Sequence, residues 1–131
     1  IDEICFVCIA SEHSAEIFDL YAEHLSDLRM RLPVKKQVGT LLRYSVMTPL
    51  AHEILKKAWK RGILLGDWYT QVIAPSSTDL EAFLYRNGSC PVSQRMAEHV
   101  LNLPTHINIT REKAMDIVGF LKGVYGEVRN V

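Results

Sequence analysis

Between positions 40 and 125, apolar residues repeat with the period of a strand in some segments and with the period of a helix in others. Over Thr40–Met47, Leu42, Tyr44 and Val46 alternate with polar residues, as in a half-buried strand. The other predicted elements are a helix over 50–61, a strand over Ile63–Tyr69, a helix that opens at Pro91, an extended segment over Asn102–His106 and a helix capped by Thr110. This order predicts an α/β (α+β) fold, in which a small, mostly antiparallel sheet has helices packed on one face and a long N-terminal helix precedes it.

Particular residue types predict where these helices begin, where they end and which side they bury. Thr48 and Pro49 predict a helix start because threonine accepts a free backbone N–H and proline has none to donate. Gly62 predicts the end of that helix. The expected buried residues are Val92, Met96, Ala97, Val100 and Leu101 for the helix after Pro91, and Ala114, Ile117, Val118, Leu121 and Tyr125 for the last helix.

The first 33 residues have two interpretations. The apolar run Ile4–Ile9 looks locally like a buried strand. Over a longer window, apolar or small residues recur three or four positions apart as far as Leu25, which is the pattern of a long helix with acids on its outer faces. Pro33 is expected to stop this helix soon after Leu32, because proline disfavours helix at the residue before it.

Length and composition bound the class of protein. The chain has 131 residues, and no apolar run approaches the roughly 18 residues of a membrane span, so one globular domain with no membrane partner is expected. Three cysteines are an odd count, which favours a reducing cytoplasmic location over a disulfide framework. The sequence starts at Ile1 without a methionine, and we therefore expect a piece of a longer protein.

The charges are sorted along the chain although the net charge is zero. Residues 1–28 carry acids and no Lys or Arg, whereas residues 29–61 carry nine bases and one acid, Glu53. This basic block (residues 29–61) is interpreted as a solvated face beside an acidic helix; the alternative is a surface that attracts an anion. Nucleic acid is not an expected partner, because aromatic residues do not alternate with the bases and the domain is not basic overall.

Several motif-like patterns lack the residues that their chemistry needs. Cys5 and Cys8 have zinc spacing but no second Cys/His pair nearby. His52 and Glu53 begin a zinc-protease pattern whose second histidine is replaced by Lys56. Cys90 has no histidine close in sequence to activate it as a nucleophile. We therefore expect no metal site and no catalytic residue in this chain.

Three runs taken together resemble one family in their order. They are Leu42-Arg43-Tyr44-Ser45-Val46, the segment from Ala58 to Tyr69, and Cys90-Pro91-Val92-Ser93 continued by Leu101-Asn102-Leu103-Pro104-Thr105-His106. These runs resemble the DegT/DnrJ/EryC1/StrS aminotransferases, pyridoxal-phosphate enzymes of fold type I that mostly make amino sugars. The resemblance covers essentially the whole chain, read as the small C-terminal domain of such an enzyme.

The resemblance implies a division of labour in a longer parent protein. Residues 1–33 would form the helix that leaves a large domain, and residues 34–131 would form the small domain. Pyridoxal 5'-phosphate would be bound to a lysine of the large domain, so this chain by itself is expected to bind no cofactor and to be inactive. The parent would be a homodimer acting on a sugar-type substrate. The alternative is a non-catalytic, aminotransferase-like domain used for binding or oligomerisation.

The residues expected to contact substrate are Trp68, Tyr69 and His106. Trp68 and Tyr69 precede the long loop Thr70–Ser89, where aromatic faces with polar edges suit stacking on a sugar or a base. The alternative for Trp68 is a core residue that seals the helices against the sheet. His106 follows a strand, and it is either a contact at the rim of the site or a histidine with a structural hydrogen bond. The family's usual His-Tyr-Pro-like segment is replaced here by Trp68-Tyr69-Thr70-Gln71, which departs from the pattern of the standard nucleotide-sugar enzymes.

Overall fold

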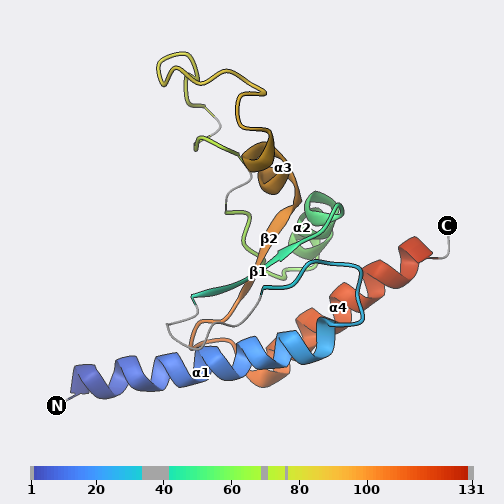
Figure 1. The fold of residues 1–131 in the computed structure, drawn as a ribbon. Helices are drawn as coiled ribbons and strands as arrows, with labels where there is room; N and C mark the ends of the chain where they lie inside the picture. The colour runs from blue at the N-terminus through green and yellow to red at the C-terminus, as the bar shows by residue number, and fades with distance from the viewer. Residues whose placement is uncertain (1, 34–41, 69–70, 76, 130–131) are drawn as a thin grey trace.

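The computed structural model describes residues 2–33, 42–68, 71–75 and 77–129, and of residues 2–10 it describes the backbone only. The elements are α1 (Asp2–Leu25), β1 (Arg43–Met47), α2 (Ala51–Lys60), α3 (Pro91–His99), β2 (Val100–Pro104) and α4 (Arg111–Arg129). Figure 1 shows α1 and α4 lying across one end of the molecule and the loop before α3 at the other, with α3 between this loop and the sheet. Within the described ranges, no helix is both long enough and apolar enough to cross a bilayer.

The sheet has two antiparallel strands, and each of its edges is extended by one isolated bridge. β1 and β2 pair from Arg43 opposite Pro104 to Met47 opposite Val100. At the outer edge of β1, the backbone of Arg31 bonds to Met47, and at the outer edge of β2 the backbone of Gly66 bonds to Asn102. The predicted mixed fold with an antiparallel sheet is confirmed.

The predicted strand over Ile63–Tyr69 is wrong, because among its described residues, 63–68, only Gly66 pairs with the sheet. The backbone N–H of Ile63 is used instead to close the end of α2, by donating to Ala58 O at 2.9 Å. The N–H of Leu65 then donates to Ile63 O in a tight turn. Pairing with β2 therefore starts and ends at Gly66 within the residues that the structure describes, and Tyr69 lies outside them.

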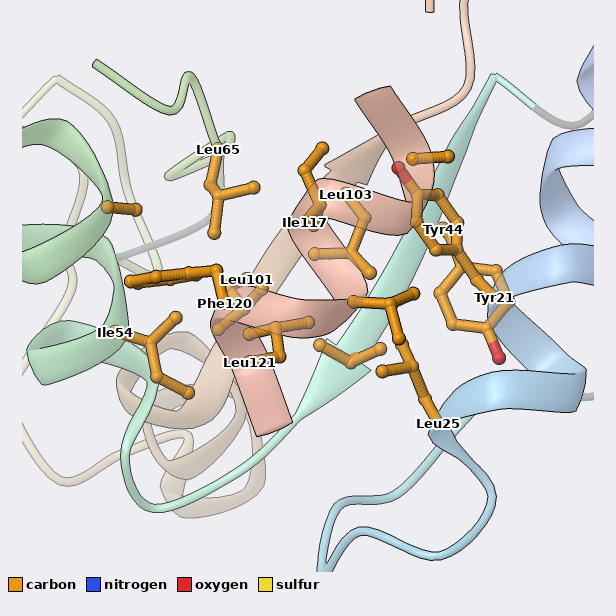
Figure 2. Close-up of a cluster of buried hydrophobic side chains, with 14 of the residues drawn as sticks. Tyr21, Leu25, Tyr44, Ile54, Leu65, Leu101, Leu103, Ile117, Phe120 and Leu121 are labelled. Atoms are coloured by element: carbon orange, nitrogen blue, oxygen red, sulfur yellow. The ribbon is translucent and has the colours of Figure 1, made fainter. Parts of the chain in front are cut away.

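The hydrophobic core lies on one face of the sheet. Tyr44 and Val46 of β1 and Leu101 and Leu103 of β2 alternate with residues of the opposite face, and all four are fully buried. They belong to one cluster with apolar residues of α1, α2 and α4, as Figure 2 shows. Three helices thus cover one face, as predicted. The other face, here called the open face, carries Arg43, Ser45 and Met47 of β1, which are exposed or half-buried, and their partners on β2, which are buried.

The N-terminal segment is helical, so the strand interpretation of Ile4–Ile9 is wrong. The helix nevertheless ends at Leu25 and not near Pro33. Leu28 N–H donates to Leu25 O in a turn, and Arg31 then joins the sheet through two hydrogen bonds with Met47 of 2.8 and 2.9 Å. Pairing with the sheet edge, and not the proline, therefore decides where the helix stops.

The predicted starts of α3 and α4 are confirmed, whereas the N-cap of α2 is Leu50 and not Thr48. The Thr48 hydroxyl accepts the N–H of Leu50 at 3.2 Å immediately before α2, and the Thr110 hydroxyl accepts the N–H of Lys113 at 3.2 Å in the first turn of α4. Pro91 is the first residue of α3. The buried face of α4 is also as predicted.

The prediction for the buried face of α3 is only partly right. Ala97 is buried on α3, but Val92 is 60% exposed and Met96 is 47% exposed. Val100 and Leu101 are buried on β2 and not on the helix, which ends at His99. Figure 1 shows the reason: α3 lies beyond the end of the sheet, beside the long loop and away from α1 and α4. The first turns of α3 therefore have no layer above them to bury their apolar side chains.

The segment between α2 and α3 contains neither helix nor strand in its described residues, in agreement with the predicted loop over Thr70–Ser89. It projects away from the two-layer body (Figure 1). Phe83 and Leu84 at its tip are 66% and 94% exposed, and Leu84 has a left-handed backbone with φ of 54°. An exposed leucine in that conformation is uncommon, which sets this loop apart from the compact part of the fold.

Candidate functional site

The open face of the sheet brings an arginine and a tryptophan together. The guanidinium carbon of Arg43 lies 3.9 Å from the centroid of the Trp68 ring. Arg43 is the first residue of β1, and Trp68 lies two positions after Gly66, whose bridge to Asn102 brings this segment against the edge of the sheet. A cation over an indole is the most favourable of the cation–π pairs, and here it holds the ring in a defined place on the surface.

Asn102 connects this pair to the centre of the sheet. Its side chain is 2% exposed, and its carbonyl oxygen accepts a hydrogen bond from the Ser45 hydroxyl at 2.6 Å. Its amide nitrogen donates to the backbone oxygen of Trp68 at 3.3 Å. A buried amide that is bonded on both sides fixes the segment that carries Trp68 against the strands.

Gly66 allows this close approach. A Cβ atom at this position would lie 3.2 Å from the Cβ of Asn102 and 3.5 Å from the Nη1 atom of Arg43. Its backbone exchanges hydrogen bonds of 2.8 and 2.9 Å with Asn102. Any larger residue would push the bridging segment, and with it Trp68, away from the strand.

Trp68 does not seal the core, because 54% of it is exposed. The structural alternative raised by the sequence is therefore wrong for this residue. Tyr69 lies outside the described residues. His106 lies in the turn after β2, which is the end of the sheet that also carries Arg43, and its side chain is exposed. Among the described residues, its ring has no hydrogen-bond partner, so a structural hydrogen bond does not explain this histidine.

Arg43 and Asn102 were missed as site residues by the sequence analysis. For Asn102 a signal existed, since a single asparagine inside the apolar run Val100–Pro104 requires buried partners. For Arg43 the alternation placed the side chain on the polar face but gave no indication of Trp68, which is 25 positions away. That contact depends on the Gly66 bridge, which the sequence does not reveal.

The described lysines do not fit a pyridoxal-phosphate site. A lysine that binds this cofactor needs a desolvated environment and a lowered pKa. The Lys57 ammonium instead donates to Glu127 at 2.8 Å and contacts Glu53 at 3.0 Å, and its hydrogen bonds to these carboxylates, chiefly the one to Glu127, raise its pKa. The remaining described lysines, Lys56, Lys60, Lys113 and Lys122, are exposed.

Other candidate chemistry is not assembled in the described part of the chain. No group of three or more His, Cys, Asp or Glu side chains there has the arrangement of a metal site. Cys90 is exposed and immediately precedes α3. The side chains of Cys5 and Cys8 lie outside the described set. Of the basic block, Arg61 lies over the Phe120 ring at 5.4 Å and Lys57 is paired, which is typical of a solvated face.

The fold and the site define a small α+β domain whose helices cover one sheet face and whose open face carries an arginine–tryptophan pair. The chain belongs to the DegT/DnrJ/EryC1/StrS aminotransferase family, whose family model matches residues 9–122. The resemblance expected from the sequence motifs is thereby confirmed. A search of curated proteins found no match to this chain.

Solved structures share the fold at low sequence identity. A DegT/DnrJ/EryC1/StrS aminotransferase from Brucella abortus is 20% identical with a TM-score of 0.77, and it aligns over 94% of this chain and 33% of its own. DesV from S. venezuelae, solved in complex with a ketimine intermediate, is 19% identical with a TM-score of 0.80 over 93% of this chain and 33% of its own. The aminotransferase TlmJ from Streptoalloteichus hindustanus is 18% identical with a TM-score of 0.73, over 91% and 32%. The chain thus spans about a third of the length of these structures.

Proposed function

We propose that this chain is the small C-terminal domain of a pyridoxal-phosphate-dependent aminotransferase that acts on an amino-sugar precursor, such as a nucleotide-linked sugar. In this proposal residues 1–33 connect to a large domain and residues 34–131 form the small domain. The large domain provides the cofactor lysine, and the parent is a cytoplasmic homodimer. Family membership and the coverage of about a third of each similar structure support this division.

The observation that carries the proposal is the arginine–tryptophan pair on the open face. The Trp68 ring is held by Arg43 on one side and is still 54% exposed, so it has free aromatic surface for a ligand. Aromatic surfaces bind the apolar faces of sugars and bases, and nearby hydroxyl and amide groups give the polar contacts. In this assignment Trp68 is a wall of the substrate site, with Tyr69 beside it in sequence and His106 at its rim. None of them performs the chemistry.

The test compares two tryptophans in the natural polypeptide that contains this chain. We expect Trp68→Ala to lower kcat/KM for the sugar substrate about five- to tenfold, because an aromatic contact of about 1 kcal/mol or more is lost. Trp59→Ala is the matched control, since Trp59 is similarly exposed at 47% but lies on α2, where its indole N–H donates to Leu65 O at 3.1 Å. The visible absorbance of the lysine-bound cofactor should stay unchanged in both variants.

Equal kinetics for Trp68→Ala and the unmodified enzyme would remove Trp68 from the substrate wall. Equal losses in both tryptophan variants would indicate a general effect on folding, which thermal melting would also reveal. Tyr69→Ala extends the test to the neighbouring position: we expect a raised KM with the cofactor absorbance intact. If the substrate constants were untouched in both Trp68→Ala and Tyr69→Ala, the open face would not be the wall of the site.

A further inference from the structure

A second feature of the open face is a groove at the end opposite the arginine–tryptophan pair. It has a volume of about 620 Å³, within the range of roughly 300–1,000 Å³ that small-molecule sites occupy. It is lined by Arg31, Leu32, Pro33, Ser45, Met47, Val92, Arg95, Met96 and Val100. Arg43 and Met47 lie four residues apart on β1, which corresponds to about 13 Å along a strand. The groove is lined by neither Arg43 nor Trp68, although Ser45, which lines it, also donates to Asn102, whose amide bonds to Trp68 O.

Three parts of the fold form this groove. The floor is the Met47 end of the sheet, where Met47 pairs with Val100. One wall is the segment after α1, which the two backbone hydrogen bonds between Arg31 and Met47 hold at the sheet edge. The other wall is α3, whose residues 92, 95 and 96 share one face because they are three and four positions apart. The groove is thus held by backbone pairing on one side and by a helix on the other.

The apolar side chains by which α3 lines the groove are exposed, whereas a helix covered by another layer would bury them. Val92 is 60% exposed and Met96 is 47% exposed, although their spacing predicted a buried face. Contiguous exposed apolar side chains mark interaction sites more often than single ones do. All of the apolar lining residues are aliphatic or thioether side chains. Methionine adapts its shape to irregular apolar ligands, and the absence of an aromatic ring among the residues that line this groove disfavours a stacked base or sugar.

The charged lining has one sign. Arg31 and Arg95 are both exposed, and neither forms an ion pair with any residue in the described ranges. The groove is lined by no Asp or Glu side chain among those residues. A guanidinium group binds phosphate or carboxylate through two parallel hydrogen bonds. Two unpaired arginines over an aliphatic floor are complementary to a ligand that has an anionic head and an aliphatic body.

We propose that this groove binds a small amphipathic anion, that is, an aliphatic chain that ends in a phosphate or carboxylate. The aliphatic part lies along Met47, Val92 and Met96, and the head group is bound by Arg31 and Arg95. This inference concerns a ligand other than the sugar substrate, and the residues assigned to bind it, Arg31, Arg95, Met47, Val92 and Met96, are not residues of the proposed substrate wall. Ligands of this chemical class include a free alkyl phosphate, a fatty carboxylate and the head of a single lipid.

The test measures binding of three probes to the 131-residue chain by isothermal titration calorimetry. Octyl phosphate below its micelle concentration has both parts of the ligand, octanol has only the chain, and inorganic phosphate has only the anion. We expect octyl phosphate to bind at least ten times more tightly than either of the others. Octanoate in place of octyl phosphate distinguishes a phosphate preference from a general anion preference, and phospholipid vesicles with and without an anionic lipid test a membrane source.

Two double variants separate the head-group and chain contacts. Arg31→Gln/Arg95→Gln should weaken octyl phosphate binding about tenfold and leave octanol binding unchanged. Val92→Thr/Met96→Gln should weaken both octyl phosphate and octanol. Arg86→Gln/Arg111→Gln is the control, because these two arginines are exposed but do not line the groove, and it should bind octyl phosphate normally.

Binding of octanol as tight as that of octyl phosphate would overturn the proposal, as would failure of all three probes to bind. An equal loss in the groove and control arginine variants would reduce the effect to net charge and would also overturn it. Circular dichroism melting of each variant identifies a fold that has been lost. If the arginine variant does not fold, Val92→Thr/Met96→Gln, which removes the contacts to the aliphatic part of the ligand, still decides the outcome, because both of its positions are exposed.

Discussion

Tyr21 and Tyr44 bury their rings side by side in the core, but only one of the two hydroxyl groups has a partner. The ring centroids are 5.4 Å apart and both residues are fully buried. The Tyr21 hydroxyl donates to Pro104 O at 3.1 Å. The Tyr44 hydroxyl has no hydrogen-bond partner among the described residues. A buried polar group without a partner costs stability, whereas one that is paired contributes to it.

We therefore predict opposite results for two conservative substitutions in this pair. Tyr21→Phe should lower the free energy of unfolding by about 1 kcal/mol, because a hydrogen bond is lost and the Pro104 carbonyl is left unpaired. Tyr44→Phe should be neutral or stabilising by up to about 1 kcal/mol. Urea unfolding at neutral pH measures both. A loss for Tyr44→Phe as large as that for Tyr21→Phe would mean that the Tyr44 hydroxyl has a partner in the folded protein.

The same residues predict how stability changes in alkali. Burial raises the pKa of Tyr44 to about 12, and it also raises the pKa of Tyr21, so the folded state keeps both protons where the unfolded chain releases them. Their contribution is fully present below the unfolded pKa of about 10 and is lost as the pH rises from there towards 12. The urea concentration at the midpoint of unfolding should decrease as the pH is raised from 9 to 11, and it should decrease less in Tyr44→Phe. An identical fall in both proteins would contradict this assignment.

At two glycines we predict opposite effects on the free energy of unfolding when alanine adds one methyl group. Gly66→Ala should lower the free energy of unfolding by about 1 kcal/mol, because its Cβ would meet that of Asn102 at 3.2 Å. Gly123 lies inside α4 with nothing within 4 Å of a Cβ, so Gly123→Ala should stabilise by about 0.5–1 kcal/mol through helix propensity. Denaturant midpoints measure both. A neutral Gly66→Ala would show that the edge bridge moves freely.

At the scale of the elements, the helices were predictable and the edges of the sheet were not. The starts of α3 and α4 follow from Pro91 and Thr110, because a cap or a proline acts on the backbone next to it. The end of α1 and the strand over Ile63–Tyr69 were predicted wrongly, because both are decided by pairing with distant residues of the sheet. Local propensity does not contain that information.

The same distinction explains the candidate site. Trp68 was predictable as an aromatic residue at the start of a long loop, but its exposure and its contact with Arg43 depend on the Gly66 bridge. Val92 and Met96 have a spacing that is typical of a buried helix face, and they are exposed because α3 extends beyond the layer that would cover them. Sequence periodicity reports which residues share a face, but it does not report what lies opposite that face.

The contacts of α1 predict unequal protection along this helix. Two side chains of α1 bond to the segment between β2 and α4: the Nε2 atom of His13 is 2.9 Å from Ile109 O, and the Ser14 hydroxyl donates to Thr105 O at 3.0 Å. Phe18 and Leu25 are buried in the core. We expect the amides before Ser14 to exchange hydrogen quickly and those from Phe18 to Leu25 to be protected. Equally strong protection of both segments would contradict this, and sedimentation would show whether dimerisation is the cause.

At the scale of the whole molecule, the chain belongs to an aminotransferase family, and its described lysines do not fit a cofactor site. Both facts agree if the cofactor lysine lies on another part of a longer polypeptide, which is the core of the proposed function. The solved structures that share this fold extend over about three times the aligned length, since about a third of each is covered. Under the proposed function, the open face is one wall of a substrate site that the rest of that polypeptide completes.

The most direct test of this account locates the cofactor in the natural polypeptide that contains the chain. The protein is incubated with pyridoxal phosphate and reduced with borohydride, which fixes the cofactor to its lysine, and the modified peptide is identified by mass spectrometry. We predict one modified lysine outside these 131 residues and no stoichiometric modification when the 131-residue chain is treated alone. Specific modification of a lysine within the chain, or none anywhere in the natural polypeptide, would contradict the account.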